Sequence, residues 1–311
     1  MRTRNSSVEP MGYESYGVLV AGTMSSGKTA LINALIGNEV LPSSNEATTA
    51  CLTSIEHQSG AKEFSGSCYS ASGQEVAVSK SLSLSIVRSW NVNSEIEKIA
   101  IRGSFCAAPE LRSGLVVYDT PGPNNSQNEK HAQSLFDALR AVRFNALFYV
   151  LNVAQFGTND DINLIKLLGE QLVEKKHVRV YFILNKVDLL DAEKGESLAG
   201  CIESVRQYLS SVGFGNPVII PMMANIALVV RKKIAGARLT RVERVTLRQA
   251  LHEIGDDFES LEVNKWMYRV LLAFGFFWKK SFRNFIEGRK LRKLEALSGL
   301  NAVKYLIEGW R

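Results

Sequence analysis

A glycine-rich segment near the amino terminus has the spacing of a phosphate-binding loop. It runs from Gly22 to Thr29 and fits the pattern GxxxxGK(S/T). In such a loop, successive backbone N–H groups and the positive end of the following helix point at phosphate oxygens. Lys28 would reach the β- and γ-phosphates of a nucleotide, and the Thr29 hydroxyl would ligate Mg²⁺. The expected nucleotide contacts in this loop are Gly22, Thr23, Met24, Ser25, Ser26, Gly27, Lys28 and Thr29.

An aspartate follows a second apolar segment, LVVY, and begins the sequence DTPG. The carboxylate of Asp119 would hold a water on the Mg²⁺ ion, and the N–H of Gly122 would face the γ-phosphate. Taken alone, this short pattern is typical of many turns. Its place after a predicted strand and downstream of a phosphate-binding loop favours a nucleotide site.

A third motif, NKVD, follows the apolar segment VRVYFIL and begins at Asn185. The Asp188 carboxylate would accept two hydrogen bonds, from guanine N1–H and from the exocyclic amino group. Adenine lacks this pair of donors and would leave the carboxylate unpaired, so the motif predicts selection of GTP over ATP. Asn185 would tether the loop, and the stem of Lys186 would pack on the base.

The three motifs need a scaffold that brings three loops to one edge. Apolar runs and helical patterns alternate along the chain, which predicts an α/β fold with a mostly parallel sheet covered by helices on both faces. With the three motifs, the chain resembles the P-loop GTPases, and the resemblance implies their three-layer sandwich, followed here by a C-terminal helical extension. The segment 66–72 is predicted to form a hairpin with 50–57. The other predicted strands are 16–21, 96–105, 114–119, 146–153, 178–184 and 217–221, and the predicted helices are 28–36, 129–143, 159–175, 195–212, 225–235, 241–260, 262–286 and 288–310.

The composition is that of a globular protein in a reducing compartment. Of the 311 residues, 46% are hydrophobic and 22% are charged, which excludes a disordered or collagen-like chain. The four cysteines, Cys51, Cys68, Cys106 and Cys201, form no CxxC pair, so a structural zinc site is not expected. The amino terminus lacks the apolar stretch of a secretory signal, and the expected location is the cytoplasm.

Positive charge is concentrated at the end of the chain. The net charge is +6, and residues 265–311 hold 11 Lys and Arg against 3 Asp and Glu. This excess points to an acidic partner, a membrane surface or nucleic acid, whereas a solvated helix face is the alternative. The apolar run 266–278 is too short to cross a bilayer. Packing against the rest of the chain is the expected role of this run, with membrane-surface binding as its competitor.

The phosphate-binding loop and the residues after it resemble the dynamin superfamily, in particular its bacterial dynamin-like members. The resemblance lies in the segment SSGKTALINALIGNEVLPSSNEATTACLT and covers residues 16–230 well. The sequence DTPGPNNS is similar to the bacterial group that includes a dynamin-like protein bound to the replication sliding clamp, which adds a DNA-replication clamp complex to the expected partners. The resemblance implies Mg²⁺ as cofactor and a homodimer formed through the G domain. It also implies that Thr49, or its neighbour Thr48, is the switch I threonine that closes over Mg²⁺ and the γ-phosphate.

The chain departs from the dynamin pattern at a few positions. Met24 stands where dynamins place a glutamine that orients water, whereas Ser25 matches their P-loop serine. The base-contacting loop reads Met223-Ala224-Asn225 in place of a small polar pair, and only Ala224 and Asn225 look suited to that contact. By the resemblance, the catalytic residues are Lys28, Ser25 and Thr49, and the metal ligands are Thr29, Thr49 and Asp119.

Three regions are therefore expected: a flexible amino terminus (1–14), a dynamin-type G domain (15–230), and a basic helical extension (231–311) partly packed on it. This extension is too short for a dynamin stalk, so the chain is either a natural short form or part of a longer protein. The expected function is Mg²⁺-dependent GTP binding and hydrolysis with nucleotide-dependent dimerisation. A weakly hydrolysing, nucleotide-gated scaffold or adaptor switch is the alternative, and a ribosome-associated or metal-handling GTPase is disfavoured by the LPSSNEATTA segment.

Overall fold

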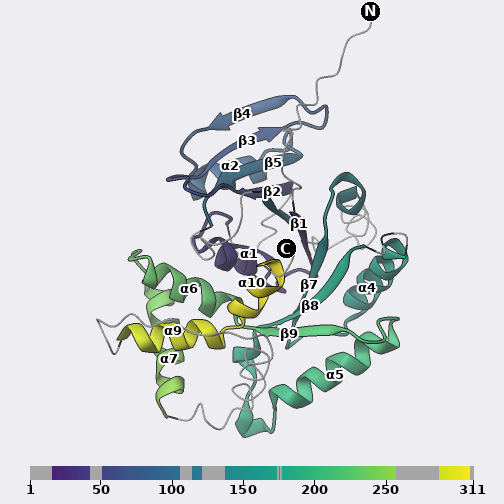
Figure 1. Ribbon diagram of the computed structural model, residues 1–311, viewed down its shortest axis with the longest axis vertical. Coiled ribbons are helices and arrows are strands. Elements are labelled where there is room, and N and C mark those ends of the chain that lie inside the picture. Colours follow the sequence, from purple (N-terminus) through teal and green to yellow (C-terminus); the bar gives the residue numbers. More distant parts are fainter. Residues whose placement is uncertain are drawn as a thin grey trace, which may run out of the picture.

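One sheet organises the computed structural model, which describes residues 16–42, 51–105, 114–120, 137–173, 175, 177–256 and 287–308. Within these residues, nine strands follow the order β4-β3-β5-β2-β6-β1-β7-β8-β9 (Figure 1). The strands are β1 Tyr16–Ala21, β2 Leu52–His57, β3 Ser65–Tyr69, β4 Glu75–Ser79, β5 Lys98–Gly103, β6 Leu115–Asp119, β7 Ala146–Asn152, β8 Arg179–Asn185 and β9 Val218–Met222. The helices are α1 Lys28–Ile36, α2 Leu84–Val92, α4 Asn159–Leu172, α5 Leu198–Ser211, α6 Ala224–Ile234, α7 Arg241–Asp256, α9 Glu287–Leu297 and α10 Leu300–Glu308, with short 3₁₀ turns η1 Val187–Leu189 and η2 Ala192–Lys194.

The half of the sheet formed by β6, β1, β7, β8 and β9 is parallel throughout. All seven residues of β7 are buried, because successive side chains face opposite sides of the sheet and helices cover both sides. Phe148 therefore belongs to the core on one face and Tyr149 to the core on the other. The predicted α/β sandwich with a mostly parallel sheet is confirmed.

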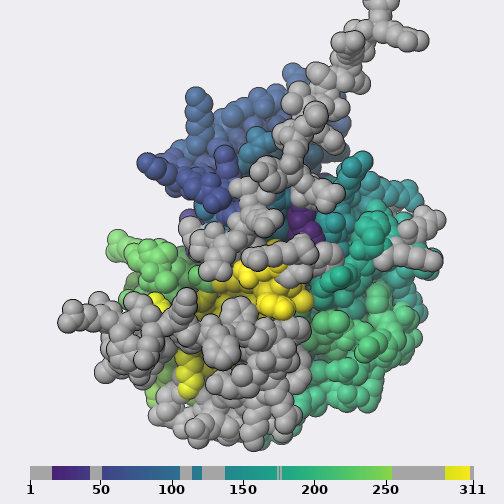
Figure 2. Space-filling view, viewed as in Figure 1, coloured from purple at the N-terminus to yellow at the C-terminus, as the bar shows by residue number. Residues whose placement is uncertain are grey.

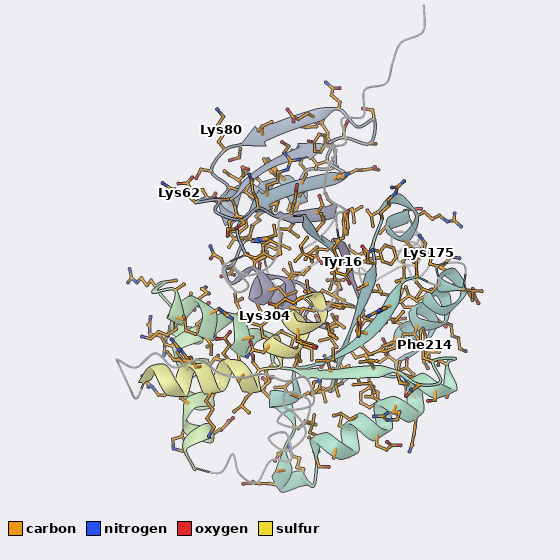
Figure 3. The ribbon with its side chains drawn as sticks, viewed as in Figure 1. Tyr16, Lys62, Lys80, Lys175, Phe214 and Lys304 are labelled. Carbon is orange, nitrogen blue, oxygen red and sulfur yellow. The ribbon has the colours of Figure 1, made fainter. Side chains whose placement is uncertain are left out.

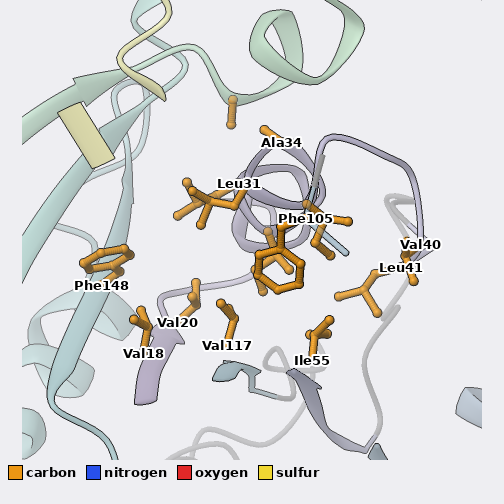
Figure 4. Close-up of a cluster of buried hydrophobic side chains, with 14 of the residues drawn as sticks. Val18, Val20, Leu31, Ala34, Val40, Leu41, Ile55, Phe105, Val117 and Phe148 are labelled. Carbon is orange, nitrogen blue, oxygen red and sulfur yellow. The ribbon is translucent and has the colours of Figure 1, made fainter. Parts of the chain in front are cut away.

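Different helices cover the two faces of the parallel strands. Helices α1 and α10 contribute to the core on one face, α4 and α5 contribute to the core on the other, and α6 contributes residues to both (Figure 1). Figure 4 shows the first of these cores, where Val18 and Val20 of β1 lie below Leu31 of α1. Phe105, 1% exposed, closes this core beside the helix. Helix α1 is thereby fixed over the strand that carries the glycine-rich loop.

The remaining strands are arranged differently from the prediction. Strand β2 pairs with β6 antiparallel and with β5 parallel, whereas β3 lies between β5 and β4. The predicted hairpin between 50–57 and 66–72 is therefore wrong. Alternating side chains specify which face of a strand is buried but not which strand lies beside it. The sequence prediction also missed β4 and α2, although Ser83 caps α2 by accepting a hydrogen bond from Ile86 N at 3.4 Å.

The C-terminal helical segment predicted at 288–310 is two helices in the structure. Helix α9 ends at Leu297, and the chain turns at Ser298 and Gly299 before α10 begins. Gly299 has a φ of +82°, which a glycine adopts without strain. The predicted segment 262–286, which includes the apolar run, lies outside the described residues, as does most of the predicted helix 129–143. Over the described ranges, no helix combines the length and the apolar composition that crossing a membrane requires.

Candidate nucleotide-binding site

The three motifs meet at one edge of the parallel sheet. Strands β1, β6 and β8 run in the same direction, so the loops that follow them emerge at the same end. Strand β1 has β6 on one side and β7 on the other. After β1 the chain continues to β2 on the β6 side, and after β6 it crosses to β7 on the opposite side, so the strand order reverses at β1. In open α/β sheets, ligands bind at such a switch point, outside the carboxyl ends of the strands.

The glycine-rich loop has a backbone that only glycine allows at two positions. Gly22 has a φ of +146°, and a Cβ there would lie 2.4 Å from the carbonyl oxygen of Val150. Gly27 has a φ of +100°, and its Cβ would lie 2.0 Å from Asn185 Nδ2. Between them, Ser25 also adopts a left-handed conformation, with a φ of 57°. The loop is thus wrapped tightly between β7, β8 and the start of α1.

Lys28 is the first residue of α1 and is almost completely buried, with 7% exposure. Its ammonium donates hydrogen bonds to the carbonyl oxygens of Gly22 at 2.9 Å and Thr23 at 3.0 Å. Burial lowers the pKa of Lys28 to about 8, and the negative charge of Asp119 acts in the opposite direction. The loop therefore encloses a cation that has lost most of its hydration and has two neutral carbonyls as partners. A phosphate would supply the missing negative charge.

Oxygen ligands suitable for a magnesium ion flank the lysine. Asp119 ends β6, is 1% exposed, and pairs in register with Val20 of β1. Thr29, half-buried, follows Lys28 in the first turn of α1. A hydroxyl and a carboxylate are hard oxygen donors of the kind that Mg²⁺ takes beside phosphate oxygens, so these residues fit the ion. Thr49 and Gly122, the other residues predicted for this part of the site, lie outside the described residues.

Asn185, at the end of β8, joins two loops through its side chain. Its Nδ2 donates to the carbonyl oxygen of Ser26 at 2.9 Å, and its Oδ1 accepts from Ala224 N at 3.0 Å. The side chain is 2% exposed, so these hydrogen bonds are shielded from water. The glycine-rich loop and the turn between β9 and α6 are thereby held at a fixed spacing.

The rest of the NKVD motif turns outward. Lys186 has a left-handed φ of 65°, and the 3₁₀ turn η1 follows it. Asp188 is exposed to solvent, yet desolvation by the surrounding chain raises the pKa of its carboxyl, against the opposing charge of Lys186. Asn225 is exposed at the start of α6, whereas Ala224 is buried. The structure thus presents a carboxylate and an amide next to the loop that Asn185 holds.

Two polar side chains that sequence reasoning missed support the site. Asn33, buried in α1, donates to Leu41 O at 2.7 Å and accepts from the N–H groups of Val40 and Leu41 at 3.1 and 3.0 Å. Thr120, directly after β6, donates to Val20 O at 2.9 Å. For Asn33, the only signal in the sequence is that a polar residue interrupts the apolar run KTALINALI. Thr120 is part of DTPG and has no separate signal.

Comparison with known proteins places this geometry in a family. A family model described as the dynamin family matches residues 18–187, more than half of the chain. The chain belongs to the dynamin family. Its G domain contains the matched residues, and the resemblance to bacterial dynamin-like proteins is confirmed.

Relatives of known name are bacterial and longer than this chain. Dynamin-like protein A of Bacillus subtilis is 27% identical over 179 residues, which are 57% of this chain and 14% of that protein. Clamp-binding protein CrfC of Escherichia coli is 50% identical over 44 residues, which are 14% of this chain and 6% of that protein. The chain therefore spans only a small part of the length of either relative.

A solved structure shares the fold. It is described as an oligomerised bacterial dynamin pair that provides a mechanism for long-range sensing and tethering of membranes. It covers 84% of this chain at a TM-score of 0.54 and 17% sequence identity, and the match spans 41% of that chain. A second structure of a bacterial dynamin pair matches 83% of this chain at a TM-score of 0.50. At these identities the likeness concerns the fold.

Proposed function

We propose that this dynamin-family G domain binds and hydrolyses GTP. Asn185 is the observation that carries the proposal, because this one buried side chain, the first residue of NKVD, is hydrogen-bonded both to the phosphate-binding loop and to the turn that begins α6. Phosphate contacts would come from the loop amides and Lys28, and Asp188, with the Ala224–Asn225 turn, would read guanine. Thr29, Asp119 and Thr49 would hold Mg²⁺, which would neutralise charge on the β- and γ-phosphates when bound.

Catalysis by this site would consist of positioning and electrostatic stabilisation. Lys28 and the loop N–H groups would stabilise the charge that spreads over the transferred phosphoryl group as a water attacks in line. Met24 is half-buried in the loop and has no group that could orient this water. Backbone carbonyls or a second molecule must therefore do so. Dimerisation through the G domain would bring that second molecule to the site.

Phosphate release should therefore rise more steeply than in proportion to protein concentration. The measurement is the GTP hydrolysis rate per chain across a dilution series, with Mg²⁺ present and with the ion removed by a chelator. We expect the specific rate to increase with concentration and to vanish without Mg²⁺. A flat, near-zero specific rate together with tight GTP binding would instead support the nucleotide-gated scaffold.

A basic surface on the extension is consistent with an acidic partner. Among the side chains described on α6, α7, α9 and their connections, seven exposed ones are basic and one, Glu253, is acidic. Two aliphatic side chains of α7 are also exposed, Val242 at 74% and Val245 at 46%. Basic residues mixed with exposed apolar ones suit an anionic membrane surface better than nucleic acid. The basic residues are Lys233, Arg238, Arg241, Arg244, Arg248, Arg292 and Lys293.

Charge reversal on α7 should weaken binding to anionic vesicles. Arg241→Glu with Arg248→Glu should lower the affinity for phosphatidylserine vesicles at least about tenfold, since each basic residue near such a surface contributes roughly 1 kcal/mol. The matched control is Lys62→Glu with Lys80→Glu, two exposed lysines at the far end of the sheet (Figure 3). Cosedimentation measures both. Equal binding by the two double variants would exclude α7 as the membrane surface, and loss of sliding-clamp binding alone would favour that partner.

A further inference from the structure

The turn between α9 and α10 lies directly against the end of β9. The carbonyl oxygen of Ser298 accepts a hydrogen bond from Met223 N at 2.8 Å. A Cβ on Gly299 would lie 2.2 Å from Pro221 O and 3.1 Å from Met222 Cα. Residues 75 positions downstream in the chain thus touch the turn that carries Ala224 and Asn225, and in Figure 1 α10 lies beside the end of β9. The contact is too close for any residue larger than glycine.

The turn is itself held in a fixed conformation. Ser298 is fully buried, its N–H donates to Leu294 O at 2.9 Å, and its hydroxyl donates to Glu295 O at 2.6 Å. Beyond Gly299, Leu300 is completely buried in the core that α10 shares with α1 and β9. The turn is therefore rigid on both sides of the glycine. The residues of α10 appear at the surface between α6 and the parallel strands in Figure 2.

Helices α9 and α10 also contact the later turns of α6. Glu295 of α9 forms an ion pair with Arg231 of α6, and Lys304 of α10 lies 3.4 Å from Glu295 (Figure 3). The start of α6 is held by Ser298 through Met223, and its later turns are held by Glu295. Helix α6 is the element that carries Ala224 and Asn225. Its position relative to the sheet thus depends on α9 and α10.

We propose that the Ser298–Gly299 turn positions the guanine-contacting loop. This inference rests on the proposed function and extends it to residues outside the recognised motifs. The hydrogen bonds form a continuous series: Met223 N–H donates to Ser298 O, the adjacent Ala224 N–H donates to Asn185 Oδ1, and Asn185 Nδ2 donates to Ser26 O. If the Ser298–Gly299 turn is displaced, Met223 and the adjacent Ala224 lose the contact that fixes their position. The phosphate-binding loop does not depend on this turn, because Lys28 and the loop N–H groups would still contact the phosphates.

The test compares two glycine substitutions that share backbone strain but differ in contact. Gly299→Ala introduces a Cβ against Pro221 O at a φ of +82°, whereas Gly236→Ala, between α6 and α7, has a φ of +75° and nothing within 4 Å. Affinities for GTP and for tripolyphosphate are measured by calorimetry. We expect Gly299→Ala to lose about tenfold in GTP affinity and to keep tripolyphosphate affinity within about twofold, since the base contacts alone are displaced. Gly236→Ala should match the parent chain in both.

Amide exchange at Met223 gives a readout beyond affinity. In Gly299→Ala this amide should exchange faster than in the parent chain, whereas the amides of the glycine-rich loop should not change. Equal losses for GTP and tripolyphosphate would overturn the proposal, as would unchanged GTP affinity with a rapidly exchanging Met223 amide. If Gly299→Ala does not fold, Val303→Ala is the second variant, because it removes a completely buried side chain from α10 and loosens the packing of this helix on the core. The same selective loss is expected there, and equal losses again overturn the proposal.

The outcome also separates this inference from the guanine assignment itself. If the parent chain binds tripolyphosphate as tightly as GTP, the proposed guanine recognition is wrong irrespective of Gly299. If the parent chain selects GTP and Gly299→Ala still selects it equally well, the positioning role of the turn is wrong and the guanine assignment stands.

Discussion

Replacing Lys28 with methionine is expected to abolish tight GTP binding while stabilising the nucleotide-free chain. A charged hydrogen bond to phosphate contributes about 1.5–3 kcal/mol, so its loss should cost at least about tenfold in GTP affinity. Without nucleotide, the buried ammonium is costly, since burial lowers the pKa of Lys28 from 10.5 to about 8. A shift of that size corresponds to roughly 3 kcal/mol, which methionine of similar length would avoid. Thermal unfolding with and without GTP measures both effects.

The pH dependence of this stabilisation follows from the direction of the shift. Below pH 8, Lys28 is protonated in both the folded and the unfolded chain, so the full cost of the buried charge is present. As the pH rises from about 8 towards 10.5, the folded chain gives up the proton first and the parent chain recovers the stability. The advantage of Lys28→Met should therefore be greatest at pH 7 and shrink above pH 8. Lys166→Met, at an exposed position of α4, is the control and should show neither effect. If Lys28→Met keeps the full GTP-induced rise in melting temperature, the phosphate-binding assignment fails.

Strands and helices adjoining the glycine-rich loop could be predicted from the sequence because local patterns determine them. The apolar run 16–21 coincides with β1, and the helix predicted at 28–36 coincides with α1. Gly37 ends α1 in a left-handed conformation, with its N–H donating to Asn33 O, as a glycine after an apolar helical run predicts. In this region, burial on both faces of the sheet and the glycine-dependent turns are encoded within a few neighbouring residues.

Relationships between distant segments could not be predicted in the same way. The position of β2 between β5 and β6 depends on pairing partners up to 66 residues away, which alternation alone does not specify. The Ser298–Gly299 turn carries the same local glycine signal as Gly37, but its position against Pro221 O could not be predicted from the sequence. The buried carboxamide of Asn33 is a shorter-range case, because its partners Val40 and Leu41 lie in the loop beyond the end of α1, whose path the helical pattern does not specify. In each case the determining contact is tertiary.

Asp188→Asn should move base preference from guanine to xanthine. The carboxylate of Asp188 can accept from guanine N1–H and from the exocyclic amino group, whereas an asparagine offers only one acceptor and would oppose the amino group with its own donor. One charged hydrogen bond becomes neutral and the other is replaced by two opposed donors; together these cost about 3 kcal/mol, which predicts roughly a hundredfold weaker GTP binding. Xanthine carries an oxygen in place of that amino group, and the new amide can donate to it. XTP affinity should accordingly rise as GTP affinity falls.

The position of Asp188 makes this substitution a clean test of base reading. Its side chain is exposed, whereas the two buried hydrogen bonds of Asn185 hold the loop, so the loop should keep its shape in the variant. Asp191→Asn is the matched control, because this half-buried aspartate lies three residues further on and accepts from Glu193 N, as an asparagine also can, and the substitution removes only a surface ion pair with Lys194. Competition binding with GTP and XTP measures the two variants side by side. Asp191→Asn should retain the parent preference for GTP, and an unchanged preference in Asp188→Asn would show that Asp188 does not contact the base.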